Sequence, residues 1–106
     1  MEKIVISQSD ESIMYGVEEN GGIIATASVL LGEDGAYCEA IEVKEDRRNQ
    51  GIGTSFLKAL ADEHDSIVVA PDNEDAQRLY DRLGYDITDR GDWYIVDQGF
   101  GVYEIR

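Results

Sequence analysis

Two glycines at the start of a predicted helix form the first candidate site in the sequence. A strand is predicted to end near Lys44, six polar residues follow at positions 45–50, and Gly51-Ile52-Gly53 then opens the helix. The first N–H groups of a helix have no intrahelical partner and carry partial positive charge, so they attract anions. Glycine also lets a phosphate approach the backbone without a Cβ in the way. With Arg47 and Arg48 alongside, the segment indicates an anion site; the alternative is that the glycines only shape a loop.

Two well-known phosphate-binding loops do not match this segment. The Walker A motif requires a lysine directly after its second glycine, and no lysine follows Gly53. The dinucleotide motif requires a third glycine three residues later, where Phe56 stands. The glycines therefore indicate a phosphate without specifying which one.

A second candidate site lies on the next predicted helix, which carries Asn73 and Tyr80. The two residues are seven positions apart, and at about 100° per residue they return to within roughly 20° of the same helical face. A tyrosine hydroxyl, a weak acid with a pKa of about 10, can donate a proton to a leaving group. The alternatives are that Asn73 caps the helix and that Tyr80 packs in the core.

The first half of the chain is predicted to form strands. Residues 13–18 alternate with the period of two that is typical of a half-buried strand, and Asn20-Gly21-Gly22 predicts a hairpin. The predicted strands are Lys3–Ser7, the alternating segment 13–18, Ile23–Leu31 and Tyr37–Lys44. In the last strand, alternation places Tyr37, Glu39, Ile41 and Val43 on one face and Cys38, Ala40 and Glu42 on the other.

The second half is predicted to alternate between helices and strands. Helical spacing of apolar residues predicts a helix from Gly51 to Glu63, and the apolar run Ser66–Ala70 predicts a buried strand. A second helix begins after Pro71, with Asp72 or Asn73 as N-cap, and ends before Gly84. Two closing strands are predicted at Tyr85–Thr88 and Gly101–Ile105, while Trp93–Val96 between them has no assignment.

The predicted order β-β-β-β-α-β-α-β-β implies an α/β fold of the mixed α+β kind. We expect one domain over residues 1–106, with a mixed, mainly antiparallel sheet, a central β-α-β unit and two main helices that cover the sheet. The single cysteine, Cys38, cannot form an internal disulfide. No apolar run approaches the roughly 20 residues that span a bilayer, and no secretory signal is visible, so we expect a cytoplasmic protein.

Charge is the unusual bulk property of the chain. Twenty-three acidic residues oppose nine lysines and arginines, which gives a net charge of −14. Such a surface repels nucleic acid and anionic membranes, so neither is an expected partner, and it attracts cations and basic partners. Two explanations stay open: adaptation of the surface to salt or solubility, and attraction of a cationic amine substrate.

Both candidate sites match segments of a known family. Residues 43–54, which include Arg48-Asn49-Gln50-Gly51-Ile52-Gly53, resemble the acetyl-CoA signature Gln/Arg-x-x-Gly-x-Gly/Ala of the GNAT superfamily. Residues 73–85 resemble the family's next segment, Asn-x-x-Ala-x-x-Leu/Phe-Tyr-x-x-x-Gly-Phe/Tyr. The order and spacing of the two segments are those of the family, and the resemblance covers residues 12–106. It implies an acetyl-CoA-dependent N-acetyltransferase that needs no metal and acts on a primary amine, such as a protein lysine or N-terminus.

The resemblance also implies a role for each matching position. The backbone around Ile41 and Val43 is expected to pair with the pantetheine arm in a gap between splayed strands, with the N–H of Val43 polarising the thioester carbonyl. Asn73 is expected to contact the pantetheine or to order the acceptor side, and Tyr80 to protonate the departing thiolate. The residues expected to hold the pyrophosphate are Arg48, Asn49, Gln50, Gly51, Ile52, Gly53 and Thr54.

The attacking amine must lose its proton, because a lysine-type amine has a pKa of about 10.4 and only its neutral form attacks. Glu39 is predicted to share a face with Ile41 and Val43 and is the leading candidate for the base, directly or through water. The alternative is an ordinary strand acid that faces solvent. Cys38 is predicted to lie on the opposite face and is given no catalytic role.

The connection between the first two strands departs from the family pattern. Family members usually place two helices there that shape the acceptor site, whereas here only the polar stretch Gln8–Glu11 separates the strands. We therefore expect an acceptor side that is open or is completed by the second subunit of a homodimer. Two other functions stay open: a catalytically silent acyl-CoA-binding module, and a small virus-type modifier of a host protein.

Overall fold

The strands of the described residues form one mixed, seven-stranded sheet with the order β1-β2-β3-β4-β5-β7-β6. The structure, a computed structural model, describes residues 1–33, 35–88 and 99–106, so Trp93–Val96 lies outside the described residues. The elements are β1 (Glu2–Gln8), β2 (Ser12–Glu19), β3 (Gly22–Gly32), β4 (Gly35–Val43), a 3₁₀ turn (Glu45–Arg47), α1 (Ile52–His64), β5 (Ile67–Val69), α2 (Glu74–Arg82), β6 (Asp86–Ile87) and β7 (Tyr103–Ile105).

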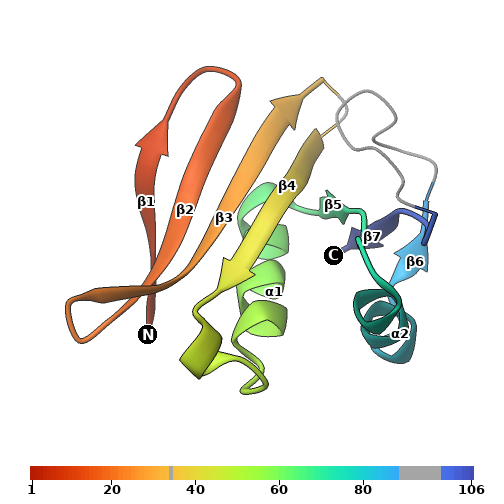
Figure 1. Ribbon diagram of the computed structural model, residues 1–106. Coiled ribbons are helices and arrows are strands. Elements are labelled where there is room, and N and C mark those ends of the chain that lie inside the picture. The colour runs from red at the N-terminus through yellow and green to blue at the C-terminus, as the bar shows by residue number, and fades with distance from the viewer. Residues whose placement is uncertain (34, 89–98) are drawn as a thin grey trace.

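The predicted order and fold class are confirmed. Strands β1 to β4 form an antiparallel meander, and β4 then connects through α1 to β5, its parallel neighbour. Strand β7 is antiparallel to both β5 and β6. Figure 1 shows α1 crossing one face of the sheet behind β4, and α2 lying beside β6 and β7. No helix within the described ranges is long and apolar enough to cross a membrane.

Helix α1 closes the main core against the sheet. Its apolar residues recur every three or four positions, so they form one face of the helix. Leu60 is completely buried against the sheet, where Val29, Ile67 and Ile105 are also completely buried. Burial of each such side chain contributes about 1.5–3 kcal/mol relative to exposure. Ile52, the first residue of α1, is also buried, so the N-terminus of the helix is held in the same core.

A β-bulge interrupts strand β4 at Glu39. Ala40 pairs with Ser28 of β3, but the next residue of β3, Val29, pairs with Cys38, so Glu39 is an extra residue in the ladder. Such a residue breaks the alternation of side chains along the strand. The two halves of β4 therefore cannot be assigned to faces by a single period of two.

The bulge overturns the predicted faces of β4. Cys38 belongs to the main core cluster, and Ile41 and Val43 pack against that same cluster, whereas Tyr37 belongs to a second cluster. The predictions that Cys38 lies opposite Ile41 and Val43, and that Tyr37 shares their face, are wrong. The sequence pattern could not reveal the extra residue, because a single polar residue such as Glu39 also occurs in regular strands.

Helix α2 begins and ends with the predicted capping residues. Asn73 is the N-cap, and its Oδ1 accepts a hydrogen bond of 2.8 Å from the N–H of Ala76. Gly84 follows the C-cap with a φ of +77°, a conformation that favours glycine. The N–H of Tyr85 donates back to the carbonyl of Tyr80 at 3.2 Å, which completes a Schellman motif. These caps fix where α2 starts and stops.

Candidate active site

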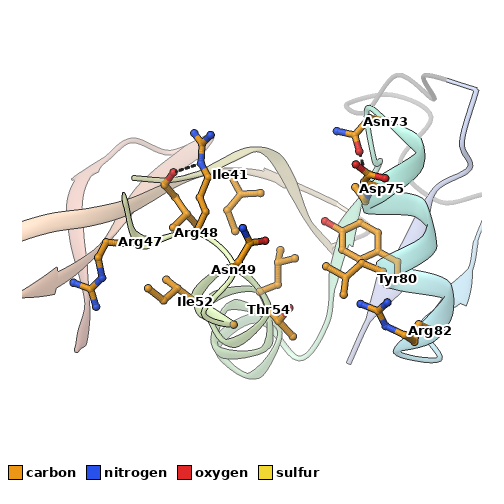
Figure 2. Close-up of a pocket in the computed structure, with 16 residues that line it drawn as sticks. Ile41, Arg47, Arg48, Asn49, Ile52, Thr54, Asn73, Asp75, Tyr80 and Arg82 are labelled. Carbon is orange, nitrogen blue, oxygen red and sulfur yellow. Dashed lines mark hydrogen bonds between the residues drawn. The ribbon is translucent and has the colours of Figure 1, made fainter. Parts of the chain in front are cut away.

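A pocket of about 690 Å³ lies between the end of β4, the N-terminus of α1 and helix α2. Figure 2 shows these three elements converging on it, with β4 above, α1 viewed near its end, and α2 on the right. The residues that line it are Ile41, Val43, Arg47, Arg48, Asn49, Gly51, Ile52, Gly53, Thr54, Leu57, Asn73, Asp75, Ala76, Leu79, Tyr80 and Arg82.

Most of the sequence-predicted site residues meet in this pocket, and the two that do not line it are Glu39 and Gln50. Glu39 is exposed on β4, and its Oε2 accepts a hydrogen bond of 3.3 Å from the hydroxyl of Ser28. Gln50 turns toward the preceding loop, where its Oε1 accepts a hydrogen bond of 3.3 Å from Nε of Arg47.

The N-terminus of α1 offers free backbone donors to the pocket. The first N–H bonded back to the turn is that of Ser55, which donates to the carbonyl of Gly51 at 3.0 Å. The N–H groups of residues 52–54 precede it in the first turn, where a helix has no internal acceptors. Gly51 and Asn49 both adopt positive φ, +78° and +62°, and this turn directs the chain into the helix.

Gly53 has a different role from Gly51. Its backbone does not have a positive φ, and an added Cβ would lie 3.6 Å from Val43 Cγ2, an ordinary van der Waals distance. The fold would therefore accept a larger residue at this position. Because Gly53 also lines the pocket, the missing Cβ leaves space beside the free N–H groups. This cradle fits a phosphate that approaches the backbone closely.

Strand β4 directs backbone groups toward the pocket. The N–H of Lys44 donates to the carbonyl of Ile24 in β3 at 2.8 Å. Along a strand these groups alternate in direction, so Ile41 and Val43 point their N–H and C=O groups away from β3. Within the described residues, β5 pairs with β4 only as far as Cys38, so the edge of β4 beyond the bulge is open.

Arg48 crosses this open edge. Its Nε donates a hydrogen bond of 2.9 Å to the carbonyl of Val43, drawn as a dashed line in Figure 2. This contact fixes the base of the guanidinium group and leaves its two terminal nitrogens without a carboxylate partner in the described structure. Arg48 therefore adds a positive charge between the open strand edge and the cradle.

Arg47 is engaged elsewhere. Both terminal nitrogens of its guanidinium donate to the two carboxylate oxygens of Glu19 at the end of β2. This hydrogen bond lowers the pKa of Glu19 below its usual value. The sequence suggested that Arg47 and Arg48 both charge the site; in the structure the charge of Arg47 is paired, and Arg48 supplies the cation of the cradle.

Tyr80 reaches into the pocket from α2. Its side chain is 7% exposed, and its ring packs against Tyr85 and Tyr103 with centroids 5.9 and 5.6 Å away. Within the described residues its hydroxyl makes no hydrogen bond, and Figure 2 shows it directed toward the space between α2 and β4. Burial, followed by the proximity of Cys38, raises the pKa of Tyr80 to about 12. The hydroxyl is therefore protonated at neutral pH and free to donate.

Cys38 lies in the same core cluster as Tyr80 but is chemically quiet. It is 3% exposed, and burial raises the pKa of its thiol to about 12. A neutral thiol is a poor nucleophile. Of these two neighbouring side chains, Tyr80 is therefore the candidate for a catalytic role, as a proton donor.

The polar side chain of Asn73 is occupied by the helix cap. Besides the bond to Ala76, its Nδ2 donates to Oδ1 of Asp72 at 2.9 Å. Capping, one of the two roles considered for this residue, is thus observed. Across the described part of the chain, no group of three or more His, Cys, Asp or Glu side chains could hold a metal ion.

Four pocket residues of α2 are not among the site residues predicted from the sequence: Asp75, Ala76, Leu79 and Arg82. Asp75, Leu79 and Arg82 recur at i, i+4 and i+7, which places them on one stripe of the helix. That spacing was visible in the sequence. The spacing alone does not indicate a pocket, because a charged stripe on a helix is usually a solvated face.

A model of the acetyltransferase (GNAT) family matches residues 2–85, which is most of the chain. The chain belongs to the GNAT family of acetyltransferases. Family membership and the observed fold together support acyl-CoA-dependent N-acetyltransferase activity. None of the curated proteins compared with the chain matches it significantly in sequence.

Solved GNAT structures share this fold at low sequence identity. The ribosomal-protein-S18-alanine N-acetyltransferase from Escherichia coli is 23% identical with a TM-score of 0.68, over 92% of this chain and 70% of that one. A GNAT acetyltransferase from Elizabethkingia anophelis with acetyl-CoA bound is 23% identical with a TM-score of 0.66, over 91% and 76%. The PaiA N-acetyltransferase from Thermoplasma acidophilum, in complex with coenzyme A, is 12% identical with a TM-score of 0.66, over 91% and 61%.

Proposed function

We propose that this GNAT protein transfers the acetyl group of acetyl-CoA to a primary amine, such as a protein lysine or an N-terminus. One observation carries the proposal: a single pocket joins the open edge of β4, the glycine cradle of α1 and the free hydroxyl of Tyr80. Similar structures were determined with acetyl-CoA or coenzyme A bound, which supports acetyl-CoA as the donor.

The pocket residues can bind both the pyrophosphate and the pantetheine arm of acetyl-CoA. The N–H groups at the start of α1, with the guanidinium of Arg48, match the pyrophosphate in charge and donor geometry. The outward-facing N–H and C=O of Ile41 can pair with the amides of the pantetheine arm, as an added strand would. The C=O of Val43 already accepts from Arg48, which leaves its N–H for the thioester. This arrangement leads the thioester toward Tyr80.

The reaction then follows from the groups at that end of the pocket. The neutral amine attacks the thioester carbonyl carbon, and the N–H of Val43 faces the side on which oxyanion charge develops. As the C–N bond forms and the C–S bond breaks, Tyr80 donates its proton to the departing sulfur. The amine nitrogen loses one proton in exchange, which restores the tyrosine hydroxyl through solvent.

Glu39 is our candidate for the group that removes the extra proton of the ammonium form before attack, so that the neutral amine can react. It does not line the pocket, but it occupies the bulge between Cys38, which lies near Tyr80, and the open edge of β4. Its carboxylate is exposed and, among the described residues, accepts a single hydrogen bond, from Ser28, so a water molecule would have to relay the proton.

Incubation of the protein with acetyl-CoA and a panel of amines, peptides and cell lysate tests the proposal. Mass spectrometry should find acceptors that gain one acetyl group, and titration calorimetry should find acetyl-CoA binding. Absence of acetyl-CoA binding would overturn the assignment of the pocket.

A catalytically silent acyl-CoA-binding module is the second candidate. One observation favours it: β1 and β2 are joined directly by residues 9–11, so no helices shape an acceptor site between them. Binding of acetyl-CoA with no transfer to any acceptor would select this function over the first.

A further inference from the structure

Arg82 presents a second cationic group to the pocket, on the side opposite Arg48. Figure 2 shows Arg48 beside β4 and Arg82 at the far end of α2, with the cradle between them. Arg82 makes no ion pair or side-chain hydrogen bond with the rest of the described chain, although 23 acidic residues are present.

The other cations of the chain are mostly neutralised by carboxylates. The ion pairs are Lys3–Glu63, Arg47–Glu19, Lys58–Asp62, Arg78 with Glu74 and Asp75, and Arg106–Glu104. Within the described ranges, only Lys44, Arg48 and Arg82 lack a carboxylate partner, and the last two of these line the pocket. In the part of the chain that the structure describes, unpaired positive charge is thus concentrated around the pocket.

The stripe of α2 that faces the pocket carries opposite charges at its two ends. Asp75 lies at its N-terminal end and Arg82 at its C-terminal end, separated by the apolar Leu79. Seven residues of helix span about 10 Å, so an anionic group beside this stripe is repelled at one end and attracted at the other. The negative charge of Asp75 is in turn offset by Arg78.

Coenzyme A carries two separate anionic groups, the pyrophosphate and the 3′-phosphate of the adenosine ribose. The cradle and Arg48 match the first of them, and Arg82 is the other pocket cation without a carboxylate partner in the described residues. We propose that Arg82 binds the 3′-phosphate and so makes the pocket selective for CoA thioesters over their 3′-dephospho forms. The proposal rests on the proposed function, because it assumes that the donor occupies this pocket.

Calorimetric titration with CoA and with 3′-dephospho-CoA tests this assignment. The wild-type protein should bind CoA about 10-fold more tightly, which corresponds to about 1.4 kcal/mol. Arg82→Gln removes the charge and should bring the ratio of the two dissociation constants close to one. Arg82→Lys keeps the charge and should retain most of the preference. Since the attraction is exposed to solvent, the wild-type preference should also shrink at high salt.

Arg78→Gln is the matched control, because Arg78 lies one turn earlier on the same helix, is paired with acids and does not line the pocket. This variant should keep the preference. A role of Arg82 limited to stabilising the C-terminus of α2 would lower Tm without changing the ratio of dissociation constants. An unchanged ratio in Arg82→Gln, or equal binding of both ligands by the wild type, overturns this inference alone. Failure of CoA itself to bind overturns the proposed function as well.

Discussion

At the scale of single residues, the pocket separates groups that hold their protons from groups that carry charge. Tyr80 and Cys38 are buried beside one another, and burial raises the pKa of each to about 12. Arg48 keeps a free positive charge a short distance away along β4. A buried hydroxyl next to an open cationic entrance suits a reaction in which charge develops on sulfur at the closed end while phosphates stay at the open end.

Tyr80→Phe tests the proton donor. We expect turnover to fall by about 10²-fold, the low end for general acid catalysis, because a thiolate of pKa near 8.5 already leaves without strong assistance. The dissociation constant for acetyl-CoA should stay nearly unchanged. Stability should change little, since the hydroxyl has no hydrogen bond in the described structure. Steady-state kinetics with calorimetric binding measures both quantities.

Tyr85→Phe is the control for that substitution. The Tyr85 ring packs on Tyr80 with centroids 5.9 Å apart, but it does not line the pocket. Its loss of a hydroxyl should leave turnover at the wild-type value. Equal turnover in wild type and Tyr80→Phe would remove Tyr80 from the mechanism.

At the scale of elements, the start of α1 combines two glycines with different purposes. Gly53→Ala should raise or preserve Tm, because alanine is favoured over glycine in a helix by about 0.5–1 kcal/mol and its Cβ would make an ordinary contact with Val43. The same methyl should weaken acetyl-CoA binding by about 10-fold or more, the cost of displacing one charge-assisted hydrogen bond. Thermal denaturation and calorimetry give the two effects separately.

Gly51→Ala provides the contrast, because Gly51 has a φ of +78° that alanine rarely adopts. This substitution should lower Tm. If Gly53→Ala leaves acetyl-CoA affinity intact, the glycine cradle is not the phosphate site.

The contact between α1 and β2 should depend on pH. Nε2 of His64 and the hydroxyl of Tyr15 are 2.8 Å apart, with Lys3, Glu63 and Asp65 as charged neighbours. Burial lowers the pKa of His64 below 6.5, and this effect exceeds the attraction of Glu63. Because the folded pKa is below the unfolded one, the contribution to stability is present above pH 6.5 and is lost as pH falls through the folded value.

Thermal denaturation at pH 7.5 and 5.5 measures this contribution. Tm should fall across the interval in the wild type and fall less in His64→Gln. Most carboxylates stay ionised over that range, so they contribute little to the difference. An equal fall of Tm in both proteins would show that His64 is not responsible.

Local sequence patterns predict the elements of this protein well, but they do not contain the pairing and packing that complete the site. Periodicity, apolar runs and turn signals together predicted the strands and α-helices of the described residues in the right order, and the capping signals located α2 at Asn73 and Gly84. The bulge at Glu39 was missed because it depends on pairing with β3, which a local pattern does not contain. Gln50 was placed with the phosphate loop by its motif, but in the structure its side chain bonds to Arg47. The cationic end of α2 at Arg82 was missed because only the fold brings it opposite Arg48.

At the scale of the whole molecule, the net charge of −14 acts against the folded state. Twenty-three acids confined to a particle with a radius of gyration of 13.1 Å repel one another. The ion pairs of the described residues are largely at the surface, and such pairs contribute only about 0–1 kcal/mol each. Salt shortens the screening length from about 10 Å at 0.1 M to 3 Å at 1 M, so it weakens repulsion across the whole surface while it removes little from these pairs.

We therefore expect Tm to rise steadily between 0.05 and 1 M potassium chloride. The double variant Asp10→Asn with Glu11→Gln is the control, because both residues are exposed and neither forms an ion pair in the described structure. It should start from a higher Tm and gain less from salt.

A Tm that is flat or falls with salt would mean that charge repulsion does not limit the stability of the fold. Attraction of a cationic acceptor would then be the remaining explanation of the acidic surface. In that case kcat/KM for a basic peptide, compared with a neutral peptide of equal length, should decrease as salt is added.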